Sequence, residues 1–187
     1  MRSIWNIPVI ATIVFCIYAC NSGTNEVQKS AEETTVGGGQ SAVQDNESAK
    51  DVVKVAAGSQ DHTTLVAAIK QAELVDALSN AGPFTVFAPT NAAFDKLPKG
   101  TVDDLMKKDN KEKLQDILQY HVYVGSLKAD FLQDGQTLNQ VNGGNITISK
   151  KDGKIIVNNS ASVVASIPAS NGIIHVIDGV LLPPSKN

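Results

Sequence analysis

The chain has 187 residues, of which 16 are Lys or Arg and 19 are Asp or Glu, so its formal net charge is −3 at pH 7. This length suits one ordinary domain, and the near balance of charges gives no sign of the large basic face that binds nucleic acid. Its two cysteines, Cys16 and Cys20, both lie at the amino-terminal end. We therefore expect no disulfide, no thiolate catalysis and no cysteine metal site in the domain.

Residues 1–20 have the layout of a secretory leader. A basic start at Arg2 precedes an apolar run over 7–18, which is short for a transmembrane helix. The ending IYAC at 17–20 resembles the bacterial lipobox, in which the cysteine thiol receives the lipid and becomes the mature amino terminus. We predict a lipoprotein-type signal peptide with Cys20 as the lipidation site; an uncleaved or conventionally cleaved leader is the alternative.

Lipidation at Cys20 predicts that the protein stays on its membrane, because two or more acyl chains anchor a protein stably. Asn21 is not the aspartate that resembles the inner-membrane retention signal of Gram-negative lipoproteins. We therefore expect a lipid-anchored protein of the bacterial cell envelope, in the outer membrane. Residues 21–49 lack aromatic side chains and contain three glycines at 37–39, which predicts a disordered tether with a reach of about 30 Å.

Helical patterns come first in the remaining chain. We predict a helix over 50–57 and further helices over 91–96, 103–106 and 111–121. Between them, a helical region begins at a cap on Asp61 or Thr63 and ends at Gly82-Pro83. A short strand over 84–88 interrupts them and is apolar enough to be buried on both faces. Pro89 ends this strand, and Thr90 is the expected N-cap of the helix that follows.

Strand patterns dominate after residue 122. Segments 145–149 and 154–158 alternate in polarity around Asp152-Gly153, a pair that favours a hairpin turn. Further strands are predicted over 163–165, 173–177 and 180–182, and Asn171-Gly172 predicts a positive φ at Gly172. The predicted fold class is α+β, with a helical first part packed on a mostly antiparallel sheet.

Three blocks in this order carry a family resemblance: TVFAPTNAAF at 85–94, LQYHVYV around Tyr120-His121, and NGIIHVIDGVLLP at 171–183. With the segments 51–65 and 100–106 they resemble the fasciclin (FAS1) domain over residues 50–184. The positions that match its signature are Thr85, Phe87, Pro89, Thr90, Asn91, Phe94, Asn171, Gly172, His175 and Asp178. The resemblance implies a single wedge-shaped β-sandwich with helices packed on one side, in an extracytoplasmic module for cell adhesion and matrix attachment.

The Tyr120-His121 pair has two interpretations. The family resemblance implies an adhesion determinant, because a Tyr-His pair flanked by branched aliphatic residues has been proposed for that role. The helical stripe that ends at His121 instead predicts a buried, hydrogen-bonded imidazole, with the Tyr120 ring packed and its hydroxyl near water.

Animal matrix proteins of the fasciclin family have an Asp-Ile integrin-recognition element just before the last of the three blocks. This chain has Ser166-Ile167 at that place, so integrin-type recognition is not expected.

The other chemistry-bearing residues give no catalytic pattern. His62 is expected to be solvated at a helix start, and His175 to be buried in a strand. HExxH, CxxC, GxSxG and a phosphate-binding loop are absent from the sequence, so we expect no enzyme, metal or cofactor.

Two functions stay open. The first is a binding module for cell adhesion or for attachment to surface or matrix polymers or proteins, with a protein or polysaccharide partner. The second is a periplasmic small-ligand-binding or accessory lipoprotein, which an apolar pocket would favour.

Overall fold

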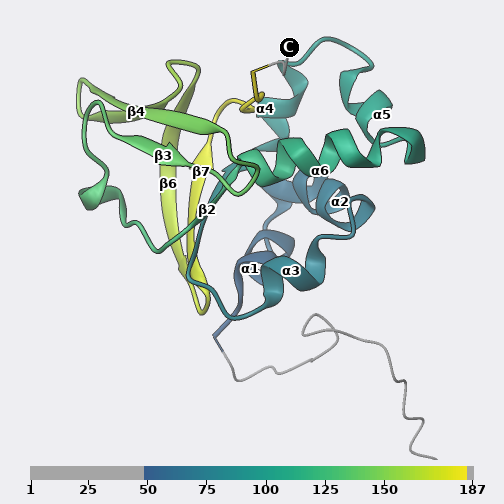
Figure 1. The fold of residues 1–187 in the computed structure, drawn as a ribbon, viewed down its shortest axis with the longest axis horizontal. Coiled ribbons are helices and arrows are strands. Elements are labelled where there is room, and N and C mark those ends of the chain that lie inside the picture. Colours follow the sequence, from purple (N-terminus) through teal and green to yellow (C-terminus); the bar gives the residue numbers. More distant parts are fainter. Residues whose placement is uncertain (1–48, 185–187) are drawn as a thin grey trace, which may run out of the picture. The chain divides into compact units, whose positions relative to one another are not determined.

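A layer of helices packs against one side of a curved sheet in the computed structural model of the chain (Figure 1). The structure describes residues 49–184; the predicted leader, Cys20 and almost all of the predicted tether lie outside them. The helices are α1 (Val52–Ala57), η2 (Gln60–His62), α2 (Thr63–Gln71), α3 (Val75–Ser79), α4 (Asn91–Asp95), α5 (Thr101–Leu105), η3 (Lys108–Asn110), α6 (Lys111–Tyr120) and η4 (Ala129–Phe131). None of the helices within this range is long and apolar enough to span a bilayer.

Side-chain caps explain where two of the helices begin. The Asp51 carboxylate accepts the Lys54 N–H at 2.8 Å and starts α1. The Thr90 hydroxyl accepts the Ala93 N–H at 3.3 Å and starts α4, which confirms the predicted cap. The predicted cap of α2 at Asp61 or Thr63 is wrong, because that cap comes from a distant residue.

Asn91 provides the missing cap. Its Oδ1 atom accepts the Thr64 N–H at 3.0 Å and the Thr63 hydroxyl at 3.2 Å, and its Nδ2 donates to Gln60 O at 2.9 Å. A local sequence pattern cannot show this, since the capping group lies in α4, after the first strand. Asn91 thereby joins α4 to the start of α2.

In residues 49–184 seven strands form one sheet in the order β2-β1-β7-β6-β5-β4-β3. They are β1 (Phe84–Pro89), β2 (Val122–Val124), β3 (Thr137–Asn139), β4 (Asn145–Lys151), β5 (Lys154–Val157), β6 (Ala161–Ala169) and β7 (Gly172–Ile177). Only the β1–β7 pair among these is parallel, so the mostly antiparallel α+β prediction is confirmed. The Val141 N–H donates to Val122 O at 2.9 Å, which brings the two ends of the sheet together and almost closes it.

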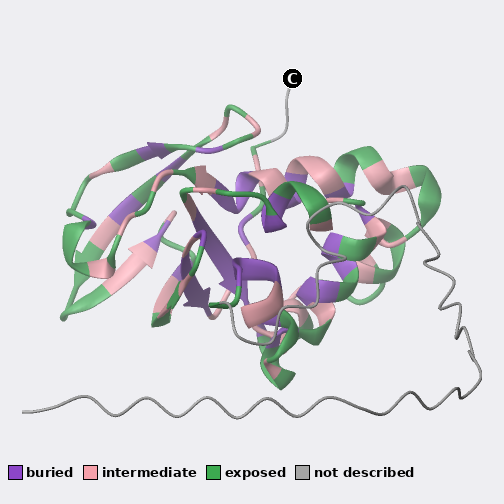
Figure 2. Cartoon of the chain, turned by 90° about the horizontal axis from the view of Figure 1, so that it is seen from below, coloured by how far each residue is buried: buried purple, intermediate pink, exposed green. Residues whose placement is uncertain are grey.

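Strands β1 and β7 separate two apolar cores. Val86 and Ile174 belong to the core shared with the helices, whereas Phe87 and Ile177 belong to the core enclosed by the sheet. This is the expected outcome of period-two alternation in strands that are covered on both faces. Figure 2 shows the buried residues concentrated along these strands and the facing helices.

The strand predictions succeed where turn chemistry is explicit. Asp152 and Gly153 both have positive φ (51° and 75°) and connect β4 to β5 as predicted. The predicted strand over 163–165 is the centre of the longer β6, which has a bulge there. The prediction of a strand over 180–182 is wrong, because the Leu181 N–H donates to His121 Nε2 at 3.1 Å instead of to a neighbouring strand.

The positive φ predicted for Gly172 is also wrong. Its φ lies outside the left-handed region, and the reason for glycine is close approach: a Cβ atom there would lie 2.0 Å from Phe84 O. The parallel pairing of Phe84 with Gly172 brings the two backbones together. Backbone proximity therefore requires the absence of a side chain at this position.

Candidate functional site

His121 ends α6 and is buried (3% exposed). Its Nδ1–H donates to Ile117 O at 2.8 Å, and its Nε2 accepts the Leu181 N–H at 3.1 Å. These two bonds require the neutral imidazole with the proton on Nδ1. Burial lowers its pKa to about 4, against the smaller opposing effect of the Ile117 carbonyl. The ring therefore connects α6 to the carboxyl-terminal segment and has no free nitrogen for a partner.

Tyr120 is anchored in the sheet core. Its hydroxyl donates to Asn145 O at 2.7 Å and accepts Asn158 Nδ2–H at 2.9 Å. The prediction of a hydroxyl near water is wrong, because both of these partners belong to the protein and the residue is almost fully buried. Gly144 makes room for the ring, since a Cβ there would lie 2.8 Å from it.

Half of the ten signature residues join segments that are distant in the chain. Asn171 Oδ1 accepts the Val52 N–H at 2.9 Å, and its Nδ2 donates to Leu78 O and Asn80 O, both at 2.8 Å. Asp178 Oδ1 accepts the Ser162 N–H at 2.6 Å. Asn171 thus fastens the helical layer to the turn between β6 and β7, Asp178 fastens β6 to the end of β7, and Asn91 joins two helices.

Thr85 and His175 hold the segment after β2. The Thr85 hydroxyl donates to Gly125 O at 2.7 Å and accepts the Leu127 N–H at 3.0 Å. His175 Nε2–H donates to Leu127 O at 2.8 Å, so its Nδ1 accepts from the Ser166 hydroxyl at 2.8 Å. Burial lowers the pKa of His175, with the Leu127 carbonyl acting in the opposite direction. As predicted, His175 is buried; its ring centroid lies 5.6 Å from that of Phe87.

His62 is not solvated, so that prediction is wrong. The short η2 turn brings its ring inward, where it is 4% exposed and its Nδ1 lies 2.9 Å from Ser59 Oγ. Burial lowers its pKa, opposed by the nearby Asp61 carboxylate. Among the described residues its Nε2 has no hydrogen-bond partner.

Two of the hollows that flank α6 are lined mainly by apolar side chains. The first, which we call the apolar notch, has a volume of about 130 Å³ and is lined by Leu74, Ala77, Leu78, Phe84, Leu118, Gln119, Val122 and Val141. Val141 is 46% exposed, and Val124, which pairs with the notch residue Phe84, is 63% exposed. The sequence analysis missed both valines, although the branched aliphatic residues flanking the Tyr-His pair pointed toward Val124.

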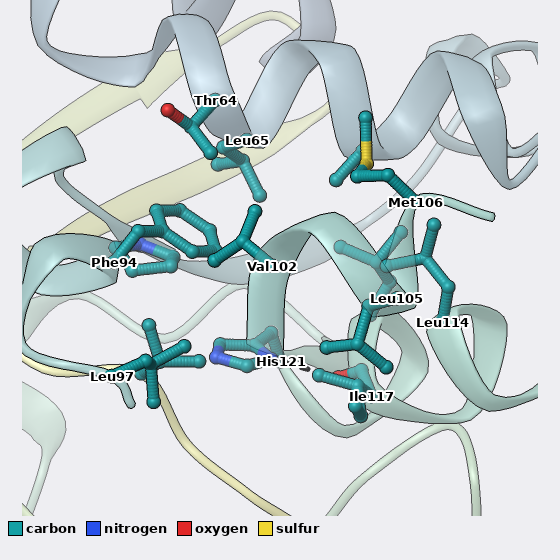
Figure 3. A pocket seen from close by; sticks show the side chains of 14 residues that line it. Thr64, Leu65, Phe94, Leu97, Val102, Leu105, Met106, Leu114, Ile117 and His121 are labelled. Atoms are coloured by element: carbon teal, nitrogen blue, oxygen red, sulfur yellow. Dashed lines mark hydrogen bonds between the residues drawn. The ribbon is translucent and has the colours of Figure 1, made fainter. Parts of the chain in front are cut away.

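The second hollow, the α5 cavity, has a volume of about 30 Å³ and lies among α2, α4, α5 and α6. Figure 3 shows the His121 ring and the apolar side chains of Phe94, Leu105 and Met106 around it. The signature residues Pro89 and Phe94 both line this cavity. Within residues 49–184, no cluster of three or more His, Cys, Asp or Glu side chains is placed to hold a metal ion.

Comparison with known proteins agrees with this architecture. The fasciclin domain model matches residues 60–183. Protein sll1483 of Synechocystis sp. is 52% identical over 138 residues, which cover 74% of this chain and 76% of that protein. The cell surface glycolipoprotein MPB83 of Mycobacterium bovis is 38% identical over 144 residues, which cover 74% of this chain and 63% of that protein.

The solved structure of a FAS1 domain pair from the insect cell adhesion molecule fasciclin I matches with a TM-score of 0.65. The match is 20% identical and covers 71% of this chain and 51% of that one. The likeness shows the α+β fold with helices on one side of the sheet. Fold and sequence agree: the chain belongs to the fasciclin domain family.

Proposed function

We propose that this protein is a membrane-anchored, extracytoplasmic binding module that attaches cells to a surface or matrix component. Family membership supports an adhesion-type domain. A relative named a cell surface glycolipoprotein fits the lipid anchor that we propose at Cys20. The outer membrane of a bacterial envelope is the proposed location.

The observation that carries this proposal is the apolar notch with its exposed rim. Val124 and Val141 stand 63% and 46% exposed beside a hollow of about 130 Å³. Exposed apolar side chains near a pocket are typical of an interaction site, where one anchoring side chain of the partner is desolvated. The buried Tyr120 and His121 act from beneath, because they fix α6 and β2, whose residues line the notch.

The lining of the notch favours a protein partner over a polysaccharide. Gln119 is the one residue of the lining with a polar side chain. A sugar would bury hydroxyl groups without enough hydrogen-bond partners, which costs about 1–3 kcal/mol for each unsatisfied group. An aliphatic or aromatic side chain of a protein loses no hydrogen bond on entering.

The test compares three valine-to-glutamate variants on cells that display the protein. Val124→Glu and Val141→Glu place a charge on the notch rim, whereas Val164→Glu places the same charge on β6 at a residue that is 60% exposed. We expect the first two variants to lose attachment to protein-coated surfaces and to cells of the same strain, with unchanged thermal midpoints. Equal attachment by all three variants would reject the notch as the contact site. Protease shaving of intact cells tests surface exposure separately.

The second candidate, a small-ligand-binding protein, needs an apolar pocket of roughly 300–1,000 Å³. The α5 cavity is apolar but has a volume of only about 30 Å³. A hollow of about 520 Å³ beside α6 is large enough, but three of its seven lining residues, Glu112, Lys113 and Asp116, have charged side chains. Attachment is therefore the better-supported function, and any ligand of the α5 cavity needs α5 to move.

A further inference from the structure

The segment that covers the α5 cavity is the least buried stretch of the helical layer. No residue within 94–113 is buried, although the segment contains five large apolar side chains that line the cavity: Phe94, Leu97, Val102, Leu105 and Met106. All five are half-buried. The cavity wall thus leaves apolar area in water that an occupant could cover.

The hydrogen bonds around α5 are local. Asp104 N–H donates to Gly100 O, Met106 N–H donates to Val102 O, and the side chains of Lys107 and Asn110 both donate to Asp104. These bonds keep the helix folded without fastening it to α2 or α6. Segments with few buried contacts are the ones that open most readily.

The α5 cavity has two polar side chains in its lining, His121 and Thr64. Both ring nitrogens of His121 already have partners, and the other lining residues are apolar except Thr64. A charged or hydroxyl-bearing group inside would lose its hydrogen bonds to water without replacement. The occupant must be apolar where it enters, and a cavity volume of about 30 Å³ has room for about one methyl or methylene group before α5 moves.

We propose that the α5 cavity binds the end of an unbranched alkyl chain, which enters between α5 and α6 as α5 moves outward. The alkyl chain covers the half-buried side chains of the cavity wall, while the polar head group of the ligand stays in solvent. Each further methylene that enters raises the affinity about fourfold, as the transfer free energy of one methylene predicts. The affinity stops rising at the chain length that fills the opened cavity.

The test uses residues 20–187 carrying Cys20→Ser, which keep all described residues and lack the protein's own proposed lipid. Met106 lines the cavity and is the only methionine after Met1, so a ¹³C-methyl label on methionine reports on this site. Hexan-1-ol, octan-1-ol and decan-1-ol are titrated while the Met106 resonance is followed. We expect saturable shifts whose affinities rise about fifteenfold for each two added methylenes until the site is full.

Three variants locate the effect. Val102→Phe fills the cavity from α5 and should abolish the saturable shift, whereas Met106→Ala enlarges it and should strengthen decan-1-ol binding, read from the rise in thermal midpoint. Asp103→Ala changes an exposed residue of the same helix and should bind as the parent does. Absence of a saturable shift, or decan-1-ol binding that Val102→Phe leaves intact, overturns the proposal.

Flotation with phosphatidylcholine vesicles identifies the source of the chain. Flotation that Val102→Phe abolishes supports an acyl chain of a membrane lipid, and alkanol binding without flotation supports a free alkyl compound. Flotation that is insensitive to Val102→Phe, without alkanol binding, means that the membrane is contacted elsewhere and overturns the proposal.

Discussion

Burial differs sharply between the paired strands β1 and β7 and the segment 94–113. After the first residue of each strand, every residue of β1 and β7 is buried, whereas no residue of 94–113 is. Five of the ten signature residues lie in these strands, and the polar side chains among them, Thr85 and His175, are bonded within the protein. Phe94 is the one signature residue in the segment, and it is half-buried like the other apolar side chains that line the α5 cavity. The difference indicates that the signature in the strands maintains the fold, while the half-buried apolar side chains of the segment are available for binding.

The largest expected effect is at the contact between the two strands. In Gly172→Val the new Cβ would lie 2.0 Å from Phe84 O, so β1 and β7 must separate, at a cost of about 4 kcal/mol in the free energy of unfolding. Gly100→Ala is the matched control, because Gly100 has a positive φ of 85° and open space around it. That variant should lose only about 1 kcal/mol. Equal losses of unfolding free energy in the two variants, measured by urea denaturation, would mean that the close approach of the two backbones is not the reason for a glycine at position 172.

Acid should lower the free energy of unfolding, because the folded protein buries neutral histidines. Burial lowers the pKa of His121 from 6.5 to about 4 and lowers those of His175 and His62. The unfolded chain therefore binds protons that the folded chain excludes, and stability is complete above pH 6.5 and falls as the pH drops toward 4. His121 alone contributes a loss of about 3 kcal/mol, measurable as a pH series of urea unfolding. A flat profile between pH 6.5 and 4 contradicts the buried neutral imidazole.

Asn171→Ala should cost about 2 kcal/mol. It removes the acceptor of the Val52 N–H and the donor to Leu78 O and Asn80 O, which connect the helical layer to the β6–β7 turn. Asn139→Ala is the control, since its amide bonds are exposed. The thermal midpoints of the two variants should differ clearly. A similar small shift of the midpoint in both would show that the Asn171 hydrogen bonds do not stabilise the fold.

The smallest effect is expected in the exposed segment. Leu105→Ala should lose about 1 kcal/mol or less, because Leu105 is half-buried, whereas Leu114→Ala, on the opposite wall of the same cavity, should lose at least about 2 kcal/mol. Equal losses would show that α5 is packed as firmly as α6.

Local patterns predicted the features that depend on neighbouring residues. The Thr90 cap, the Asp152-Gly153 hairpin and the fold class follow from turn chemistry and periodicity. Strands β2 and β3 were missed because three residues are too few to show alternation. The α2 cap by Asn91 and the bond from Leu181 to His121 depend on groups distant in the chain.

The candidate site was only partly predictable. Burial of His121 followed from its position on the apolar stripe of α6. The apolar notch and the α5 cavity could not be predicted, because each is lined by several elements that meet only in the folded chain.

The most direct test of the account measures stability and attachment on the same two variants, His121→Ala and Val124→Glu. We predict that His121→Ala loses about 2 kcal/mol of unfolding free energy but still supports attachment to the same surface at temperatures where it remains folded. Val124→Glu should keep its thermal midpoint and lose attachment. The opposite pattern, with attachment lost in folded His121→Ala and retained in Val124→Glu, would make the Tyr-His pair the contact site and contradict the account.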